Sequence, residues 1–260
     1  MSATVLPFQE LQAPENWRTV DFISDLHLQE QEMATFEVWQ TYMQNTIADA
    51  VFILGDLFEV WVGDDAVAHH VFLQQCASVL KSCAATKHVA FMRGNRDFLV
   101  GASFLDECQV QDLQDPTLLN FAAQKILLSH GDAGCLADTS YQEFRLMVRQ
   151  ETWQSTFLAK PLSERESIAR QLRMQSELLK KDPHTLYADV DDGWTAKWLA
   201  QTEAHSLVHG HTHRPDDHRL GSAQTRHVLS DWDAAAATPR AEVLRWHSTG
   251  KHERISLLHN

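Results

Sequence analysis

VFILGDLFEVWVGDD, residues Val51–Asp65, is the segment around which the rest of this 260-residue chain can be organised. The apolar run Val51–Leu54 leads directly into Gly55 and Asp56, and such a run closed by glycine is typical of a buried strand. The carboxylate of Asp56 then lies at the carboxyl end of a strand, where open α/β sheets bind their ligands. Gly-Asp after a strand is also common in plain turns, so this segment alone leaves both alternatives open.

Five predicted strands end on residue types that bind metal ions. The pairs of strand and following residues are Thr19–Ser24 with Asp25 and His27, Asp49–Leu54 with Asp56, His88–Met92 with Asn95, Arg96 and Asp97, Ile126–Ser129 with His130 and Asp132, and Ser206–Val208 with His211 and His213. Each pattern is weak alone, because a lone histidine near a strand end more often makes a structural hydrogen bond. Five such loops in order after apolar runs are not expected by chance.

The spacing within these loops predicts how the side chains point. Strand side chains alternate between faces, so Asp25 and His27 are predicted to point the same way along an extended segment. His211 and His213 are likewise predicted to converge. Glycines in the loops allow tight turns and close approach of the backbone, at Gly55, Gly94, Gly131 and Gly210.

Carboxylate, amide and imidazole groups make up this set of donors. Together they suit Mn²⁺, Fe²⁺ or Zn²⁺ better than Ca²⁺ or Mg²⁺. In a site with two metals about 3.5–4 Å apart, one carboxylate bridges both ions. Asp56 stands alone on its loop and is central in the set, so it is the predicted bridge.

Composition limits the class of protein. A net charge of −13 argues against non-specific nucleic-acid binding and suits carboxylates gathered around cations. The four cysteines have no close pairing, which predicts free thiols in a reducing compartment. No apolar run approaches the roughly 18 residues of a membrane-spanning helix, and no secretory signal is evident. The expectation is a cytoplasmic protein, with peripheral membrane contact left open by composition.

Helices are predicted between the strands, at Glu32–Ala48 and Ala66–Ala85, which indicates a layered α/β domain. An irregular leader, Met1–Trp17, precedes the first strand, and a final strand pair is expected near Thr225–Ser230 and Ala241–His247. The predicted division is an N-terminal extension (1–18), a core (19–138 and 183–260) and a helical insertion (139–182). We expect a monomer by default.

The insertion is helix-prone and locally basic, with eight Lys or Arg against five Glu between Tyr141 and Lys181. Two alternatives remain open for it. It is either a helical hairpin that only packs on the core, or a lid whose basic residues face an anionic substrate.

The five motifs, in this order, resemble those of the calcineurin-like metallophosphoesterase superfamily. The resemblance implies a four-layer α/β/β/α sandwich with a dinuclear site at one edge. It also implies a metal-bound hydroxide that attacks phosphorus in line, with both ions balancing charge. By this resemblance, one ion is held by Asp25, His27, Asp56 and His213, and the other by Asp56, Asn95, His130 and His211.

Arg96 departs from the usual superfamily motif, which is Gly-Asn-His-Asp. The histidine of that motif helps a leaving group that needs a proton. A phosphate leaving group is a weak base and needs little protonation, whereas a fixed arginine binds phosphate oxygens bidentately. Arg96 therefore indicates a phosphoanhydride substrate rather than a simple phosphomonoester.

A narrower resemblance covers Val20 to Trp232. The strings GDLFE-x-W-x-GDD, GNRDFL, HGD and GHTHRP are similar to those of the UDP-2,3-diacylglucosamine diphosphatase family. This resemblance implies hydrolysis of UDP-2,3-diacylglucosamine to 2,3-diacylglucosamine 1-phosphate (lipid X) and UMP with two Mn²⁺ ions. It places the enzyme in lipid A biosynthesis of a Gram-negative bacterium, in peripheral contact with the cytoplasmic face of the inner membrane. In that family water attacks the uridine-side phosphorus, which agrees with the argument from Arg96.

The same resemblance implies substrate contacts from both core and insertion, namely Asn95, Arg96, Asp138, Ser176 and His211. The family pattern fails after Ser176, where Lys180 and Pro183 replace the expected Asn and Lys, so Lys180 or Lys181 is the expected substitute. Apolar residues of the insertion form either an acyl groove or ordinary helix packing, or share both roles: Phe144, Met147, Val148, Trp153, Phe157, Leu158, Leu162, Ile168, Leu172 and Met174.

Two other functions compete with this interpretation. A general metallophosphodiesterase or phosphatase of the same fold is disfavoured by Arg96 and by the large insertion. A metal-binding scaffold without turnover is disfavoured because all seven ligand positions are filled. The leader and the segment 231–240 carry no predicted role.

Overall fold

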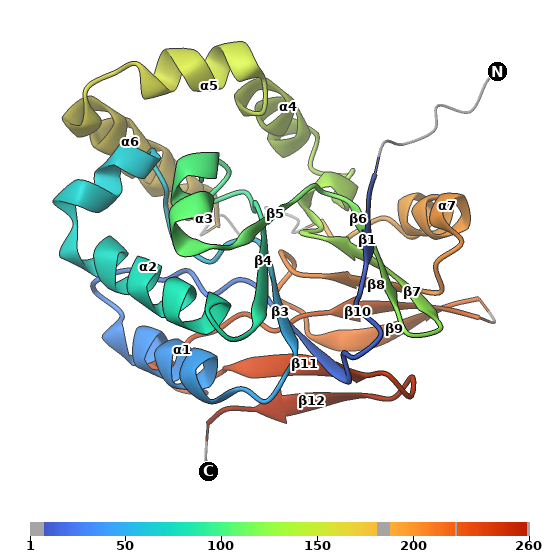
Figure 1. Cartoon of the computed structure of the whole chain (residues 1–260). Coiled ribbons are helices and arrows are strands. Elements are labelled where there is room, and N and C mark those ends of the chain that lie inside the picture. Colours follow the sequence, from blue (N-terminus) through green and yellow to red (C-terminus); the bar gives the residue numbers. More distant parts are fainter. Residues whose placement is uncertain (1–7, 181–187, 222, 259–260) are drawn as a thin grey trace.

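Two six-stranded β-sheets pack face to face in the computed structural model, which describes residues 8–180, 188–221 and 223–258 (Figure 1). Sheet A has the strand order β1-β6-β7-β8-β10-β9, and sheet B has the order β12-β11-β2-β3-β4-β5. The strands of sheet A are β1 (Gln9–Gln12), β6 (Thr117–Phe121), β7 (Gln124–Ser129), β8 (Ser206–His209), β9 (Asp216–Leu220) and β10 (Gln224–Val228). Those of sheet B are β2 (Thr19–Ile23), β3 (Ala50–Leu54), β4 (His88–Met92), β5 (Gln111–Leu113), β11 (Glu242–His247) and β12 (His252–Ser256).

Strand β3 is buried on both faces, as its continuous apolar sequence predicts. Phe52 and Leu54 belong to the core between the two sheets. Val51 and Ile53 face the opposite way and belong to the core beneath the helices. The alternation of strand side chains thus fills two apolar layers from one short segment.

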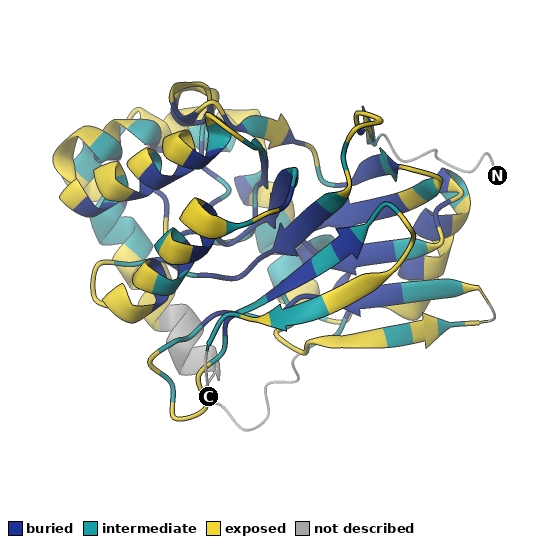
Figure 2. Ribbon diagram, turned by 60° about the horizontal axis from the view of Figure 1, so that its bottom comes forward, coloured by how far each residue is buried: buried dark blue, intermediate teal, exposed yellow. Residues whose placement is uncertain are grey.

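Helices cover the outer faces of both sheets. They are α1 (Met33–Asn45), α2 (Val71–Ala84), α3 (Ala102–Cys108), α4 (Thr139–Val148), α5 (Glu151–Leu158), α6 (Leu162–Lys180) and α7 (Asp192–Thr202), with short 3₁₀ helices at Asp64–His69 and Asp132–Gly134. The helices α1, α2 and α3 pack on sheet B, and α7 packs on sheet A through Trp198 and Leu199. Figure 2 shows the resulting pattern, with buried strands between helices whose outer sides are exposed. The predicted four-layer α/β/β/α sandwich is confirmed.

The helices α4, α5 and α6 lie within the segment that was predicted to be an insertion, and they are found together on the side of the molecule where α3 lies (Figure 1). We call these three helices the cap. The cap follows β7 in the chain, because α4 begins at Thr139, after the loop that carries His130 and Asp132.

Two predictions about the ends of the chain are wrong. The leader is not wholly irregular, because β1 pairs in parallel with β6 at the edge of sheet A. Its sequence, QELQ, has a single apolar residue and therefore no strand pattern. The expected final pair, β10 and β11, is not a pair: β10 lies between β8 and β9 in sheet A, and β11 lies between β2 and β12 in sheet B. Adjacency in sequence does not specify which sheet a strand joins.

The predicted helix at Ala66–Ala85 is divided into a 3₁₀ helix, Asp64–His69, and α2. All four cysteines are buried and free, as expected. Among the helices of the described residues, none combines the length and apolar character needed to cross a membrane.

Candidate dinuclear metal centre

All seven predicted ligand residues meet at one edge of the sandwich. They follow the carboxyl ends of β2, β3 and β4 in sheet B, and of β7 and β8 in sheet A. Parallel strands end at the same edge of a sheet, so loops that are far apart in sequence become neighbours there. The side chains form two groups.

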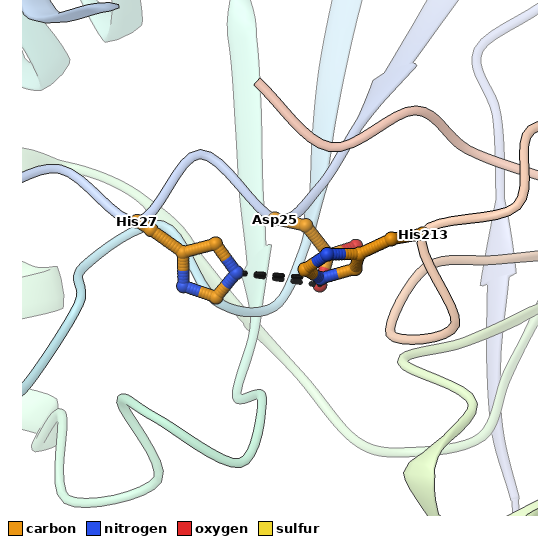
Figure 3. Close-up of side chains that lie close together, drawn as sticks. All are labelled: Asp25, His27 and His213. Carbon is orange, nitrogen blue, oxygen red and sulfur yellow. Dashed lines mark hydrogen bonds and ion pairs between the residues drawn. The ribbon is translucent and has the colours of Figure 1, made fainter. Parts of the chain in front are cut away.

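The first group contains Asp25, His27 and His213 (Figure 3). The Nε2 atoms of His27 and His213 lie 3.4 Å apart. Asp25 Oδ1 lies 3.3 Å from His213 Nε2, and this oxygen is buried without a hydrogen-bond donor in the described structure. Two facing imidazole nitrogens and an unsatisfied buried carboxylate oxygen fit a bound divalent cation.

The second group contains Asn95, His130 and His211. The side-chain oxygen of Asn95 lies 2.9 Å from His130 Nε2 and 2.8 Å from His211 Nδ1. His130 donates its other ring proton, on Nδ1, to the carbonyl oxygen of Leu54 at 2.9 Å, so Nε2 is the nitrogen that would bind a metal.

Asp56 lies between the two groups. Its Oδ2 is 4.0 Å from His27 Nε2, and its Oδ1 is 3.7 Å from His130 Nε2. Oδ1 also accepts the backbone N–H of Arg96 at 2.8 Å, which fixes the carboxylate in place. One carboxylate oxygen therefore faces each group, the arrangement required of a bridging ligand.

The backbone at the candidate ligands is not extended, so the predicted strand geometry is wrong, although Asp25 and His27 lie in one group as predicted. Positive φ angles occur at Asp25 (55°), His27 (49°), Asp56 (53°), His211 (67°) and His213 (52°). The strands end at Ile23 and His209, so these residues belong to left-handed turns. As a result His211 and His213 separate, one into each group.

Glycine is required where the loops approach each other most closely. A Cβ atom at Gly94 would overlap the carboxylate of Asp56, and one at Gly210 would overlap that of Asp25. The close approach of backbone to the cluster that was predicted for these glycines is confirmed.

Asp97 organises the loops but is not one of the predicted site residues. Its buried carboxylate accepts the backbone N–H groups of Gly94 and Leu57, each at 2.8 Å, with longer bonds from Asp56 and Phe58. Burial and the neighbouring charge of Asp56 raise the pKa of Asp97 to about 6. The sequence signal for this role was the place of Asp97 directly after Asn95 and Arg96 in the motif. The direction in which its carboxylate points depends on tertiary structure, so the sequence alone did not predict its partners.

Glu59 links three functional parts of the molecule. Its carboxylate lies 3.1 Å from His27 Nδ1, 3.6 Å from an Arg96 guanidinium nitrogen and 3.2 Å from Arg173 Nε on the cap. Burial opposes its ionisation, but the hydrogen bond to His27 and the charge of Arg96 outweigh it and lower the pKa of Glu59 to about 2. Glu59 therefore remains an anion that orients a ligand histidine and Arg96.

The two histidines of the second group have opposite proton affinities without metal. Burial opposes protonation of His130, but Asp56 and Asp25 outweigh it and raise its pKa to about 9. Burial, followed by the charge of His130, lowers the pKa of His211 to about 4. The metal-free site thus holds a proton at His130 that a bound cation must displace.

The cap contacts the site through arginines. Arg145 Nε donates to Asp132 at 2.8 Å, and the Tyr141 hydroxyl donates to the same carboxylate at 2.5 Å. Arg149 donates to the carbonyl oxygen of Gly94 at 2.8 Å. Arg165, with a side chain only 3% exposed, pairs with Asp65 and donates to the carbonyl oxygen of Val62. The basic character of the insertion is therefore directed partly at the loops of the core.

The segment 231–240, which carried no prediction, packs against the first group. Asp231 lies 3.8 Å from His213 Nδ1 and is held by the guanidinium of Arg240 at 2.8 Å. The backbone N–H of Trp232 donates to the carbonyl oxygen of Asp25 at 3.0 Å. No motif marks this segment, because its role depends on contacts made after the chain crosses from one sheet to the other.

The predicted substrate contacts divide into described and undescribed positions. Asp138 begins α4, and its carboxylate accepts the backbone N–H of Tyr141 at 3.0 Å. A substrate contact of Asp138 stays a prediction. The side chains of Ser176 and Lys180 lie outside the described part of the structure, as do Lys181 and Pro183.

The apolar residues of the cap differ in burial, and Phe144 and Leu162 are half-buried. Val148 and Phe157 are buried, and Trp153 and Ile168 pack partly buried against the core beneath the helices. Four others are exposed: Met147, Leu158, Leu172 and Met174. Ordinary helix packing therefore explains the buried apolar residues of the cap but not the exposed ones.

The fold and the site define a calcineurin-like phosphoesterase, and the model of that family matches residues 18–215. A relative from Chromobacterium violaceum, named UDP-2,3-diacylglucosamine hydrolase, is 44% identical over 82% of this chain and 90% of its own length. Relatives of the same name from Aromatoleum aromaticum and Bordetella pertussis are 40% and 38% identical, over 88% and 83% of this chain and 93% and 86% of their own lengths. The chain belongs to the family of UDP-2,3-diacylglucosamine hydrolases.

Proposed function

We propose that this protein hydrolyses the pyrophosphate bond of UDP-2,3-diacylglucosamine to 2,3-diacylglucosamine 1-phosphate and UMP, a step of lipid A biosynthesis. The observation that carries the proposal is the placement of Asp56, whose two oxygens face the two groups of candidate ligands. The names of the relatives supply the substrate.

The residues present fit two divalent cations, which we propose to be Mn²⁺. Asp25, His27 and His213 would hold one, Asn95, His130 and His211 the other, and Asp56 both. When bound, such ions lower the pKa of water and neutralise charge on a phosphoryl group. The mixture of nitrogen and oxygen donors suits manganese, although other borderline ions share this preference.

Arg96 is proposed to bind phosphate oxygens of the substrate. Its backbone N–H is fixed by Asp56 at 2.8 Å, and its guanidinium is directed by Glu59. A planar guanidinium in a fixed position recognises phosphate bidentately and has no proton to give at neutral pH. This property suits a leaving group that departs as a phosphate, which here is the lipid phosphate.

The cap is proposed to bind the acyl chains and to rest against the cytoplasmic face of the inner membrane. Exposed apolar side chains on α4, α5 and α6 support both roles, since exposed apolar patches mark sites that contact lipid or protein. Asp138, Ser176, Lys180 and His211 are proposed to contact the polar part of the substrate.

The test is a chromatographic assay for UMP released from UDP-2,3-diacylglucosamine. We expect release with Mn²⁺, none after chelation of metals, and recovery when Mn²⁺ is restored. Efficient cleavage of p-nitrophenyl phosphate with the lipid left intact would instead indicate a general phosphatase. Binding of Mn²⁺ without cleavage of either compound would indicate a scaffold.

A further inference from the structure

A second cluster of metal-binding side chains lies outside the dinuclear centre, where the outer strands of the two sheets meet. It consists of Asp217 on β9, His227 on β10 and His252 on β12. The strands β9 and β12 are the edge strands of sheets A and B, and they lie on the same side of the sandwich (Figure 1). We propose that these three side chains bind a divalent transition-metal ion, Zn²⁺ foremost, that links the two sheet edges.

The donor atoms already have the spacing of ligands around one ion. Asp217 Oδ1 lies 2.9 Å from His227 Nδ1, and Asp217 Oδ2 lies 3.1 Å from His252 Nε2. One such atom from each residue falls within 4.8 Å of the others. Neighbouring ligands of a tetrahedral zinc ion, each about 2.0–2.1 Å from the metal, lie roughly 3.3 Å apart. Small movements of these three side chains would therefore let a metal ion replace the protons that now form their hydrogen bonds.

The two imidazoles pack against the ring of Trp246, which limits their orientations. The ring of Trp246 lies 5.0 Å from that of His227 and 4.9 Å from that of His252, and the two imidazoles are 4.7 Å apart. Trp246 and His227 are both buried.

Arg254 holds the carboxylate of Asp217 through a hydrogen bond. One guanidinium nitrogen donates to Asp217 Oδ1 at 2.6 Å, and another donates to Glu242 at 2.8 Å. This arrangement leaves Asp217 Oδ2 for an ion while Oδ1 is held by a hydrogen bond, as is usual for carboxylates that bind metals. Glu242 balances the charge of Arg254, so the guanidinium does not leave the cluster net positive.

Two imidazoles and one carboxylate are a common ligand set of zinc, completed by a water molecule. Asp217 and His252 have side chains 35% and 32% exposed, which gives an ion access from solvent. Because the ligands come from both sheets, a bound ion would stabilise the folded state by linking strands that are distant in sequence. The cluster shares no residue with the dinuclear centre, so this inference is independent of the proposed reaction.

The test counts bound zinc by equilibrium dialysis and elemental analysis of the metal-free full chain reloaded with Zn²⁺. We expect wild type to bind one ion more per chain than His252→Gln. The matched control is His247→Gln, which removes a histidine on the neighbouring strand β11 that pairs with Glu253 outside the cluster. It should bind as many ions as wild type. Equal counts in wild type and His252→Gln would overturn the proposal.

Thermal unfolding gives a second measurement that does not depend on counting. Zn²⁺ should raise the Tm of His247→Gln by a few degrees more than it raises the Tm of His252→Gln. The dinuclear centre is intact in both variants. Asp217→Asn, which keeps the shape of the side chain but weakens it as a ligand, should behave like His252→Gln. If zinc shifts the Tm of all these variants equally, the cluster does not bind the ion.

Discussion

Asp56 illustrates what a sequence can predict at the scale of a single residue. Its position after a buried strand, among four other loops with metal-binding residues, was sufficient to predict a central carboxylate. The residues that orient the site were not predictable in the same way. Glu59 acts through an ion pair with His27, and Asp97 acts through hydrogen bonds from backbone N–H groups. Such contacts depend on how distant loops fold together.

Arg96→Ala should lower kcat about 10²–10³-fold, the usual cost of removing one charged group that stabilises a transition state. Phosphate binding is lost while the metal ligands remain. Steady-state assay of UMP release measures the effect, and the content of bound metal should equal that of wild type. Arg219→Ala, at an exposed position on β9, is the control and should keep full activity. A wild-type kcat for Arg96→Ala would show that Arg96 does not stabilise the transition state.

Glu59→Gln should lower metal affinity or activity about 10–100-fold, as expected for a residue that orients a ligand histidine. The amide keeps the size of the side chain but loses the charge that pairs with His27 and Arg96. Titration of the metal-free enzyme with Mn²⁺, followed by activity, separates weaker metal binding from a lower kcat. Unchanged values for both would show that Glu59 has only a structural role.

The metal-free protein should lose stability as pH rises from about 6.5 to about 9. The folded-state pKa of His130 is raised from 6.5 to about 9, so its protonated form stabilises the fold fully below pH 6.5, and this contribution disappears as pH rises through 9. Urea unfolding of wild type and His130→Gln with a chelator present measures the difference. Parallel pH profiles of the two proteins would contradict the assignment.

At the scale of elements, apolar runs predicted most of the central strands and missed the edge strands and the interior strand β6. Strand β3 has five buried residues in succession and was predicted within one residue, whereas β1 (QELQ) has no such pattern. An edge strand with one exposed face needs few apolar residues, so composition cannot identify it. The extended geometry predicted for the ligand turns was wrong for a related reason, because alternation ends where the strand ends.

The attachment of the cap to the core is a property of elements that can be tested through Arg165. Arg165→Met should lower the free energy of unfolding by about 1–3 kcal/mol, since it leaves the buried carbonyl of Val62 without its donor. Lys160→Met, which breaks an exposed pair with Glu164 on the same cap, should cost no more than about 0.5 kcal/mol. Denaturant unfolding measures both. Equal effects would show that the buried arginine does not attach the cap.

At the scale of the whole molecule, the two sheets and their helices form a frame in which five loops meet at one edge. The four layers were predicted from the resemblance of these loops, in their order, to a known superfamily, whereas the strand pattern alone predicted only a layered α/β domain. The partition of strands between sheets was not, because it depends on which edges remain free once the central strands have paired. The resulting site has two groups of candidate ligands and one carboxylate between them.

The most direct test of pyrophosphate hydrolysis at this site is a single turnover of UDP-2,3-diacylglucosamine in ¹⁸O-labelled water with Mn²⁺, followed by mass spectrometry of both products. We predict one ¹⁸O atom in UMP and none in 2,3-diacylglucosamine 1-phosphate, because in the proposed reaction water attacks the uridine-side phosphorus and the lipid leaves with its phosphate. Label in the lipid phosphate, or no UMP at all, would contradict the proposed reaction.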